Sequence, residues 1–237
     1  MSFLVFADGS ANLPGSMLKG IRLLPCDYIV NGEPQTYLGD VDHFDGSAFY
    51  DGMRKGWDIK TSLLNTDLFL SSFTPVLEAG MDIIYVSMSS GISGTLNAAV
   101  SAARELMEEY PGRYIHVVDS HGCGFGSGLL AVQAAELSEK GMDAREAAAI
   151  VDAEVPHSCQ YFTVDDLNYL KSTGRVSGAT AAIGSILNIK PILYGDSTGH
   201  IVSCGKVRGR AKAIKALAGK YLKKKIDSPK QRICISH

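Results

Sequence analysis

The chain has 237 residues, which is enough to bury a substantial core in one large domain or two smaller ones. Hydrophobic residues make up 46% of it and charged residues 20%, and because no apolar run is long enough to cross a bilayer, we expect no membrane span. The net charge of −2 hides a strong asymmetry, since eleven of the 23 basic residues and a single acidic residue lie between Cys204 and His237.

The first part of the chain alternates between apolar runs of strand length and segments with helical periodicity. We expect strands at residues 3–7, 21–24, 28–30, 83–88 and 114–118, and helices at residues 45–56, 66–79, 95–109, 129–139 and 143–155. Asn31-Gly32 predicts a hairpin turn, and residues 58–62 read as a loop. Strands that are apolar on both faces and alternate with helices predict a mostly parallel sheet with helices on both sides.

The pattern changes after Pro156. We expect a short strand at residues 161–164, a short helix at 167–173 and an Ala- and Gly-rich helix at 179–187. Two antiparallel strands at 190–194 and 200–206 and a basic helix at 211–225 follow. The predicted fold class is therefore α/β: a parallel-sheet N-terminal domain covered by helices (residues 1–156) and a second, smaller α+β domain (residues 157–237).

Cysteine and histidine spacing argues against two kinds of site. The five cysteines include no Cys-x-x-Cys pair, which speaks against a disulfide scaffold and a zinc site, and the six histidines show no ligand spacing. The N-terminal MSFLVFADGS lacks a basic region before its apolar stretch, so it predicts a first buried strand and no signal peptide. We therefore expect a cytoplasmic protein without a metal.

Most lysines of the basic C-terminal stretch fall on the predicted helix 211–225, whose apolar face comprises Ile214, Leu217, Ala218, Tyr221 and Leu222. A solvated helix face explains these lysines, and no aromatic or Arg-Gly platform accompanies them, so we expect no nucleic-acid partner. Regulatory DNA binding through residues 206–225 stays an alternative.

The segment Ser89-Ser90-Gly91-Ile92-Ser93-Gly94-Thr95 is the most informative in the chain. It follows a predicted strand and opens a predicted helix, so a loop rich in hydroxyl groups meets a helix N-terminus. The first turn of a helix offers unpaired N–H donors and a partial positive charge. This loop therefore predicts an anion site, although the same residues also suit a simple helix cap.

Three neighbouring patterns bear on this site. Asp8-Gly9-Ser10 and Asp119-Ser120 end two predicted strands, and we expect both pairs to cap the next helix. Ser93 with His121 and Asp119 supplies the residue types of a hydrolase, but the Gly-x-Ser-x-Gly elbow is missing, so a hydrolase or other small-molecule enzyme using Ser93 is an alternative only. The glycine run at 122–128 fits a dinucleotide fingerprint poorly and is better explained by close helix–sheet packing.

Seven segments occur in a defined order along the chain. They are Asp8-Gly9-Ser10, Lys60-Thr61-Ser62, the Ser89–Thr95 loop, Val118-Asp119-Ser120, Asp166-Leu167-Asn168-Tyr169-Leu170-Lys171 with Gly174-Arg175-Val176-Ser177, Leu187-Asn188-Ile189-Lys190-Pro191-Ile192, and Lys206-Val207-Arg208-Gly209. Together they resemble the DegV family of bacterial fatty-acid-binding proteins, and the resemblance spans nearly the whole chain.

The resemblance implies a protein that binds one long-chain fatty acid in a tunnel between its two domains. It implies that the carboxylate is presented to a separate ATP-binding fatty acid kinase subunit, which makes the acyl phosphate, so the protein itself is expected to have no catalysis and no cofactor. By the motifs of the family, Thr61 and Ser93 bind the carboxylate with the backbone N–H groups around Gly94, and Arg175 and Arg208 lie near the ligand mouth or the partner surface.

The chain departs from the family pattern at its C-terminal end. Family members continue to a His-Gly-Pro-Gly segment whose histidine also reaches the carboxylate, whereas this sequence stops at Ile233-Cys234-Ile235-Ser236-His237. His237 falls in an earlier strand of the family pattern and is not expected to take that role. The second domain is therefore expected to be incomplete, or the pocket to be completed in another way.

Overall fold

A computed structural model describes residues 2–176 and 188–237 of the chain. It contains two compact units, Met1–Val155 and Pro156–His237, which are described one at a time. The predicted helix at 179–187 lies outside the described residues. Within them, every helix is too short or too polar to traverse a bilayer.

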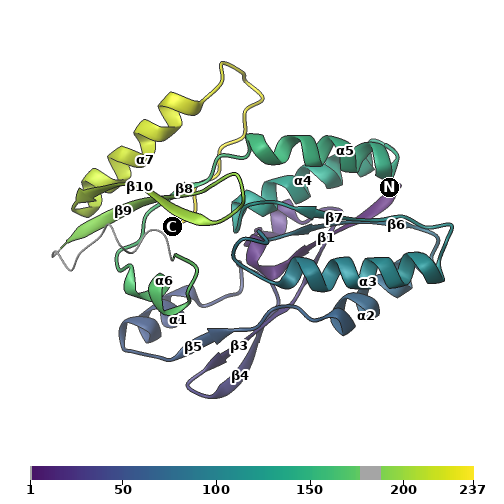
Figure 1. Ribbon diagram of the computed structural model, residues 1–237, viewed down its shortest axis with the longest axis horizontal. Helices are drawn as coiled ribbons and strands as arrows, with labels where there is room; N and C mark the ends of the chain where they lie inside the picture. Colours follow the sequence, from purple (N-terminus) through teal and green to yellow (C-terminus); the bar gives the residue numbers. More distant parts are fainter. Residues whose placement is uncertain (1, 177–187) are drawn as a thin grey trace. The chain divides into compact units, whose positions relative to one another are not determined.

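The first unit is built on a parallel sheet, as the sequence predicted. Its strands are β1 (Phe3–Asp8), β2 (Ile21–Leu24), β6 (Asp82–Ser87) and β7 (Ile115–Asp119), in the order β2-β1-β6-β7 (Figure 1). All three pairings are parallel, so the carboxyl ends of the four strands share one edge of the sheet. The residues that follow β1, β6 and β7 meet at that edge, which is where open α/β sheets bind ligands.

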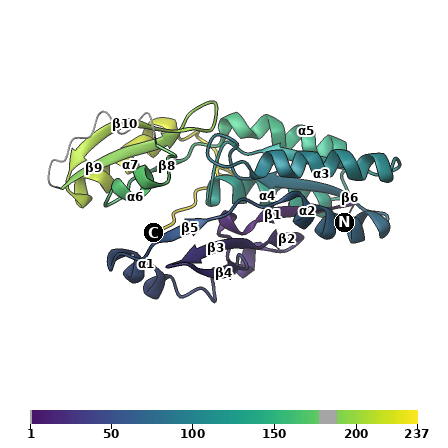
Figure 2. The ribbon, with the colours of Figure 1, turned by 60° about the horizontal axis from the view of Figure 1, so that its bottom comes forward.

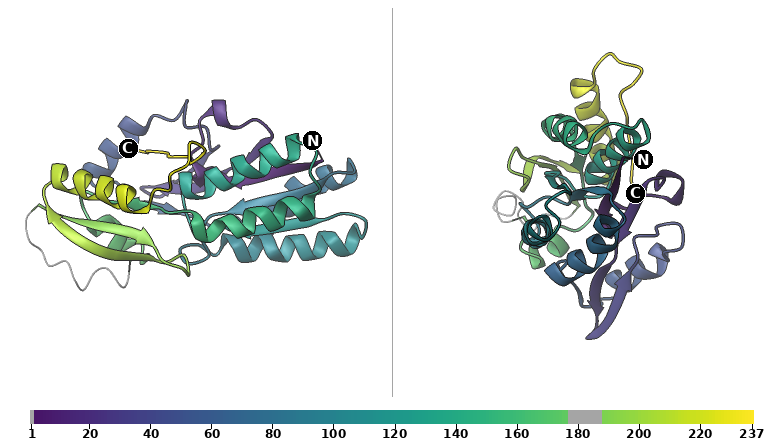
Figure 3. Two further views of the ribbon diagram at one scale, coloured as in Figure 1. Left: turned by 90° about the horizontal axis from the view of Figure 1, so that it is seen from above. Right: turned by 90° about the vertical axis from the view of Figure 1, so that its right-hand side faces the viewer.

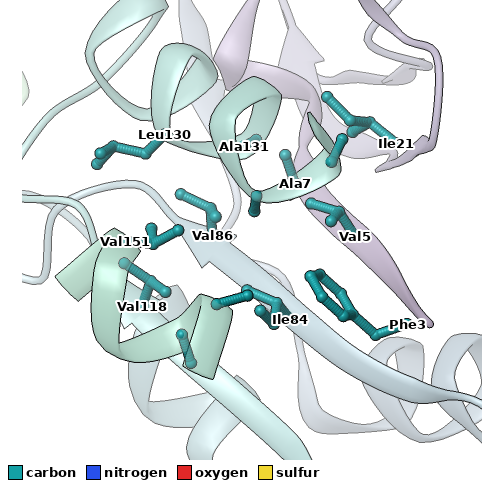
Figure 4. Packing of buried hydrophobic residues seen from close by; sticks show 14 of the residues in the cluster. Phe3, Val5, Ala7, Ile21, Ile84, Val86, Val118, Leu130, Ala131 and Val151 are labelled. Atoms are coloured by element: carbon teal, nitrogen blue, oxygen red, sulfur yellow. The ribbon is translucent and has the colours of Figure 1, made fainter. Parts of the chain in front are cut away.

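Helices cover both faces of this sheet because successive side chains of a strand point to opposite faces. The helices are α2 (Thr66–Glu78), α3 (Thr95–Glu109), α4 (Phe125–Glu139) and α5 (Ala144–Glu154). Phe3, Val5 and Ala7 of β1 pack with the buried residues of α4 and α5 (Figure 4). Leu4 and Phe6 pack with those of α2 and α3 on the other face. Figure 3 shows the two helix pairs on opposite sides of the sheet.

The helices of this unit begin in two different ways. Asp45, Asn65 and Asp143 are N-caps whose side chains accept hydrogen bonds from amides of the first turn of α1 (Gly46–Arg54), α2 and α5. Helix α3 starts after Gly94 and α4 after Gly124, and neither glycine offers a side-chain cap. The prediction of α3 is confirmed at both ends, whereas α4 begins four residues earlier than predicted.

The early start of α4 places part of the glycine run inside the helix. A Cβ atom on Gly128 would lie 2.8 Å from Leu13 Cδ2 and 3.0 Å from the Ala11 carbonyl oxygen. Gly128 therefore lets α4 approach the chain that follows β1, which supports close packing as the explanation at this one position of the run.

A second sheet of the same unit is antiparallel and lies beside α1 (Figure 2). It contains β3 (Cys26–Val30), β4 (Glu33–Tyr37) and β5 (Ile59–Thr61), in the order β4-β3-β5. Asn31 and Gly32 both have positive φ and form the predicted hairpin turn. The sequence prediction missed β4, which is polar and largely exposed, and read β5 as a loop. Three residues are too few to show a period, and β5 exists because it pairs with β3.

The second unit is an antiparallel sheet with helices, as predicted for its α+β class. Its elements are β8 (Tyr161–Phe162), α6 (Asn168–Ser172), β9 (Ile189–Gly195), β10 (Ile201–Arg208) and α7 (Arg210–Lys224), and the strand order is β10-β9-β8. Leu167, Val176 and Leu193 form a small buried cluster. Three short 3-10 helices complete the described elements of the chain, at Gly9–Ala11, Gly15–Met17 and Val155–His157.

The position of α7 was predicted correctly, but its buried face was not. Ala213 is the fully buried residue of this helix, whereas Ile214 and Leu222 are more than half exposed. The helix packs against strands β9 and β10, and Leu217 of the predicted apolar face is partly buried. The strand expected around His237 is also absent from the described structure, where residues 231–237 have no strand assignment.

Candidate functional site

The Ser89–Thr95 loop leaves the carboxyl end of β6 as a compact turn. Its first serine is buried, and the Ser89 carbonyl accepts hydrogen bonds from the amides of Ile92 and Ser93 (3.2 and 3.1 Å). The Gly91 amide donates to Ser89 Oγ at 3.1 Å. The loop folds back on Ser89, which fixes the approach of the chain to α3.

Two carboxylates from the neighbouring strands hold this loop in place. Asp8, at the end of β1, is 3% exposed, and its Oδ2 accepts a hydrogen bond from the Met88 amide at 3.1 Å. Asp119, at the end of β7, accepts from both the amide and the hydroxyl of Ser90. The exit of the central strand is therefore anchored from both sides.

The capping prediction for these two aspartates was right for one and wrong for the other. Asp8 is the N-cap of the 3-10 helix Gly9–Ala11 and accepts from the Ser10 amide at 3.1 Å. Asp119 does not cap α4, because the helix begins six residues later and Asp119 accepts from Ser90 instead. Tertiary contact with the loop replaces the local cap.

Ser93 and Thr95 form a pair of hydroxyls at the start of α3. The Ser93 hydroxyl donates to Thr95 Oγ1 at 3.0 Å, and Ser93 Oγ accepts from the Thr95 amide at 3.2 Å. Thr95 is buried, whereas Ser93 is half-buried. Thr95 Oγ1 also accepts from the Leu64 amide at 3.2 Å. Ser93 is thus the more exposed member of the hydroxyl pair, and Thr95, the buried member, is fixed by Leu64, 31 residues earlier in the chain.

The segment after β5 brings Thr61 into the same region of the unit. Thr61 is exposed and pairs with Tyr28 between strands β5 and β3. The amide of Leu64, three residues later, donates a hydrogen bond to Thr95 Oγ1. A Cβ atom on Gly94 would lie 3.4 Å from Leu63 Cδ2. Two segments thirty residues apart in the sequence therefore lie side by side, and they carry the three predicted ligand-binding residues of this unit. Sequence reasoning singled out Thr61, Ser93 and Gly94 as ligand-binding residues, included Thr95 only as a member of the loop, and did not consider Leu64.

The two predicted arginines belong to the second unit. Arg175 is exposed after α6 and donates through Nη1 to the Thr173 carbonyl, and Arg208 is exposed at the end of β10. Their roles stay a prediction, as do those of Thr61, Ser93 and Gly94.

The geometry does not assemble the hydrolase alternative. Ser93 is bonded to Thr95, while His121 Nε2 lies 3.6 Å from Asp119 Oδ2, and no hydrogen bond between Ser93 and a histidine is found among the described residues. A serine nucleophile needs a base in contact with its hydroxyl. Across the part of the chain that the structure describes, no three His, Cys, Asp or Glu side chains gather as a metal site.

Comparison with known proteins identifies the family. Residues 2–237 match the model described as an uncharacterised protein family, DegV. A DegV domain-containing protein of Clostridium perfringens is 36% identical over 236 residues, which is 99% of this chain and 81% of that protein.

Two solved structures share the fold. A DegV family protein of Ruminococcus gnavus refined with vaccenic acid has a TM-score of 0.85 at 25% identity, covering 96% of this chain and 80% of that one. DegV of Bacillus subtilis, described as a fatty acid binding protein, has a TM-score of 0.79 at 29% identity, covering 94% and 78%. The family match over 236 residues and the shared fold agree, and this chain belongs to the DegV family.

Proposed function

We propose that this protein binds a long-chain fatty acid, with the tail in an apolar tunnel and the carboxylate at Thr61, Ser93 and the backbone N–H groups around Gly94. The observation that supports this most is the hydroxyl pair Ser93–Thr95 at the start of α3, held beside the Thr61–Leu64 segment. A half-buried hydroxyl at a helix start whose N-cap is a glycine is suited to an anion, because the helix N-terminus favours negative charge. The fatty acids named for the solved relatives supply the ligand class.

The energetics of such a ligand require both parts of the site. Each buried methylene contributes roughly 0.8 kcal/mol, so a C16–C18 tail offers on the order of 10 kcal/mol before the costs of association. A carboxylate left dry and unpaired would cancel much of this gain. Fixed donors at one end of the tunnel therefore decide whether a fatty acid binds in preference to a neutral lipid.

We propose further that the protein acts in the bacterial cytoplasm without catalysis or a cofactor of its own. It presents the carboxylate to a separate ATP-dependent fatty acid kinase subunit, and Arg175 and Arg208 contribute to the ligand mouth or the partner surface. Both guanidinium groups are exposed, as this role requires. The prediction is that acyl phosphate, trapped with hydroxylamine, forms only when the loaded protein, ATP and a kinase subunit are all present. Turnover of lipid by the protein alone would contradict it.

The ligand proposal is tested on protein purified from a bacterial host. Mass spectrometry of an organic extract is expected to find fatty acid, and delipidated protein is expected to bind palmitate in a titration. Ser93→Ala with Thr61→Ala should weaken this binding by roughly 1–3 kcal/mol, because donors to a charge are lost.

The matched control is Ser101→Ala, which removes an exposed hydroxyl from the same helix, α3, and should leave the affinity unchanged. An extract free of fatty acid, together with no palmitate binding, would overturn the proposal.

A further inference from the structure

The Thr95 side chain hydrogen-bonds to both segments of the proposed carboxylate site. Its Oγ1 lies 3.0 Å from Ser93 Oγ and accepts the Leu64 amide at 3.2 Å, three residues after Thr61. It is 3% exposed, so it does not face solvent itself. We propose that Thr95 is a positioning residue that aims the Ser93 hydroxyl at the ligand carboxylate; this rests on the proposed function.

The Ser93–Thr95 pair has a limited number of protons and lone pairs to share. A hydroxyl has one proton to donate and two lone pairs to accept with. Ser93 Oγ accepts from the Thr95 amide, and Thr95 Oγ1 accepts from the Leu64 amide, so each hydroxyl has one lone pair and one proton left. Only one proton fits in the contact between the two oxygens.

The direction of that shared hydrogen bond decides what Ser93 offers to a ligand. Either hydroxyl can supply the proton of the 3.0 Å contact between Ser93 Oγ and Thr95 Oγ1, and when Ser93 supplies it, Ser93 has no proton to offer a ligand. A carboxylate only accepts hydrogen bonds, so it selects the reverse arrangement, in which Thr95 donates to Ser93 and Ser93 donates outward. Reversal needs only rotation of two hydroxyl protons. Both protons, and both lone pairs of Ser93, are then used, one lone pair of Thr95 Oγ1 is left over, and Thr95 keeps its hydrogen bond with the Leu64 amide.

Thr95 also fixes where that outward donor stands. Ser93 is held through two contacts with the same residue, one to its amide and one to its hydroxyl. The Leu64 amide in turn restrains the Thr95 side chain, because a buried amide that loses its acceptor is costly. The Ser93 donor is therefore placed relative to the Thr61 segment, and not only relative to its own loop.

The role is tested with Thr95→Val, which preserves the shape of the side chain and removes the hydroxyl. Delipidated variants are titrated with palmitate and with hexadecanol, which has the same tail but no charge. We expect Thr95→Val to bind palmitate at least 10-fold more weakly and hexadecanol within 3-fold of the parent, whereas Thr95→Ser, which keeps the hydroxyl, stays within 3-fold for both. Thr74→Val, a matched change on α2, should alter neither affinity.

A second measurement separates an effect through Ser93 from general damage. If Thr95 acts through Ser93, adding Thr95→Val to Ser93→Ala should weaken palmitate binding by less than 3-fold beyond Ser93→Ala alone. If Thr95→Val does not fold, Thr95→Cys replaces it with the same expectations, because a thiol is a poor hydrogen-bonding group.

Two results would overturn the role of Thr95 and leave the proposed function standing. In one, Thr95→Val weakens the binding of palmitate and of hexadecanol equally. In the other, Ser93→Ala weakens palmitate binding but Thr95→Val does not. A parent protein that binds no palmitate overturns the proposed function and this inference with it.

Discussion

Asp119 holds Ser90 through two hydrogen bonds, one from the Ser90 amide to Oδ1 at 3.1 Å and one from the Ser90 hydroxyl to Oδ2. Asp119 is the last residue of β7, and Ser90 lies in the loop that follows the neighbouring strand β6. A single carboxylate therefore joins β7 to the proposed ligand loop. The His121 amide also donates to Oδ1, at 3.3 Å. Asp119 is therefore an acceptor shared by the loop and by the turn that leads to α4.

Asp119→Ala is predicted to loosen the loop. Two donors of Ser90 lose a charged acceptor, and such hydrogen bonds contribute roughly 1.5–3 kcal/mol each when removed from a folded protein. Both contacts are exposed, so water replaces part of the lost bonding, and we expect a total loss of about 1–3 kcal/mol in urea unfolding together with weaker palmitate binding. Asp119→Asn, which keeps one acceptor oxygen, should give an intermediate result. Glu105→Ala on the exposed face of α3 is the control. Unchanged unfolding and binding would show that other contacts fix the loop.

The two half-buried thiols near Asp8, those of Cys26 and Cys123, are predicted to react slowly. Burial, together with the Asp8 carboxylate, raises the pKa of Cys26 and of Cys123 to about 11 from an ordinary value of 9.0. At pH 8 this leaves about one thiolate in a thousand, against about one in ten for an unshifted thiol. Iodoacetamide should therefore label the exposed Cys159 and Cys204 first, as read by peptide mass spectrometry.

The thiol prediction has an internal control. In urea all five cysteines should label at similar rates, because unfolding removes the burial that raises the two pKa values. Rapid labelling of Cys26 or Cys123 in the folded protein would contradict it.

Gly128→Ala is predicted to destabilise the first unit although alanine favours helices. The new methyl group would meet Leu13 Cδ2 at 2.8 Å and the Ala11 carbonyl oxygen at 3.0 Å, and overpacking of this kind costs about 1–3 kcal/mol. Gly112→Ala is the control, because no neighbour lies within 4 Å of its added methyl. Equal urea midpoints for the two variants would show that α4 is free to move away from the chain after β1.

The sequence predicted the order of the larger elements because their periodicity is local, and it placed the Ser89–Thr95 loop at the end of β6 for the same reason. It could not show that Thr95 accepts the Leu64 amide, since the two residues are 31 positions apart and a helix-opening threonine has the same local pattern without such a partner. Strand β5 likewise depends on its pairing with β3. For α7, the sheet beneath selects Ala213 as the buried residue, and helical periodicity alone favours the larger side chains.

Lys190 links the strand β9 to the chain before α6, and its loss is predicted to change the acid stability of the second unit. Lys190 Nζ lies 3.1 Å from Asp165 Oδ1, and Arg210 Nη1 lies 3.5 Å from the same oxygen. The hydrogen bond from Lys190, with the charges of Lys190 and Arg210, holds the pKa of Asp165 below its usual value. Because the folded-state pKa is the lower one, the stabilisation is fully present above the ordinary aspartate pKa and is lost as the pH falls through the folded-state value.

Lys190→Met should therefore lower the stability at pH 7 by less than about 1 kcal/mol, since the Asp165 side chain is 68% exposed and the pair is screened by solvent. The difference from the parent should shrink as the pH falls below 4, which urea unfolding at several pH values measures. Lys55→Met, an exposed lysine of the first unit, should show no such pH dependence. A deficit for Lys190→Met that stays constant down to pH 3 would mean that the Lys190 side chain stabilises the sheet by packing and not through Asp165.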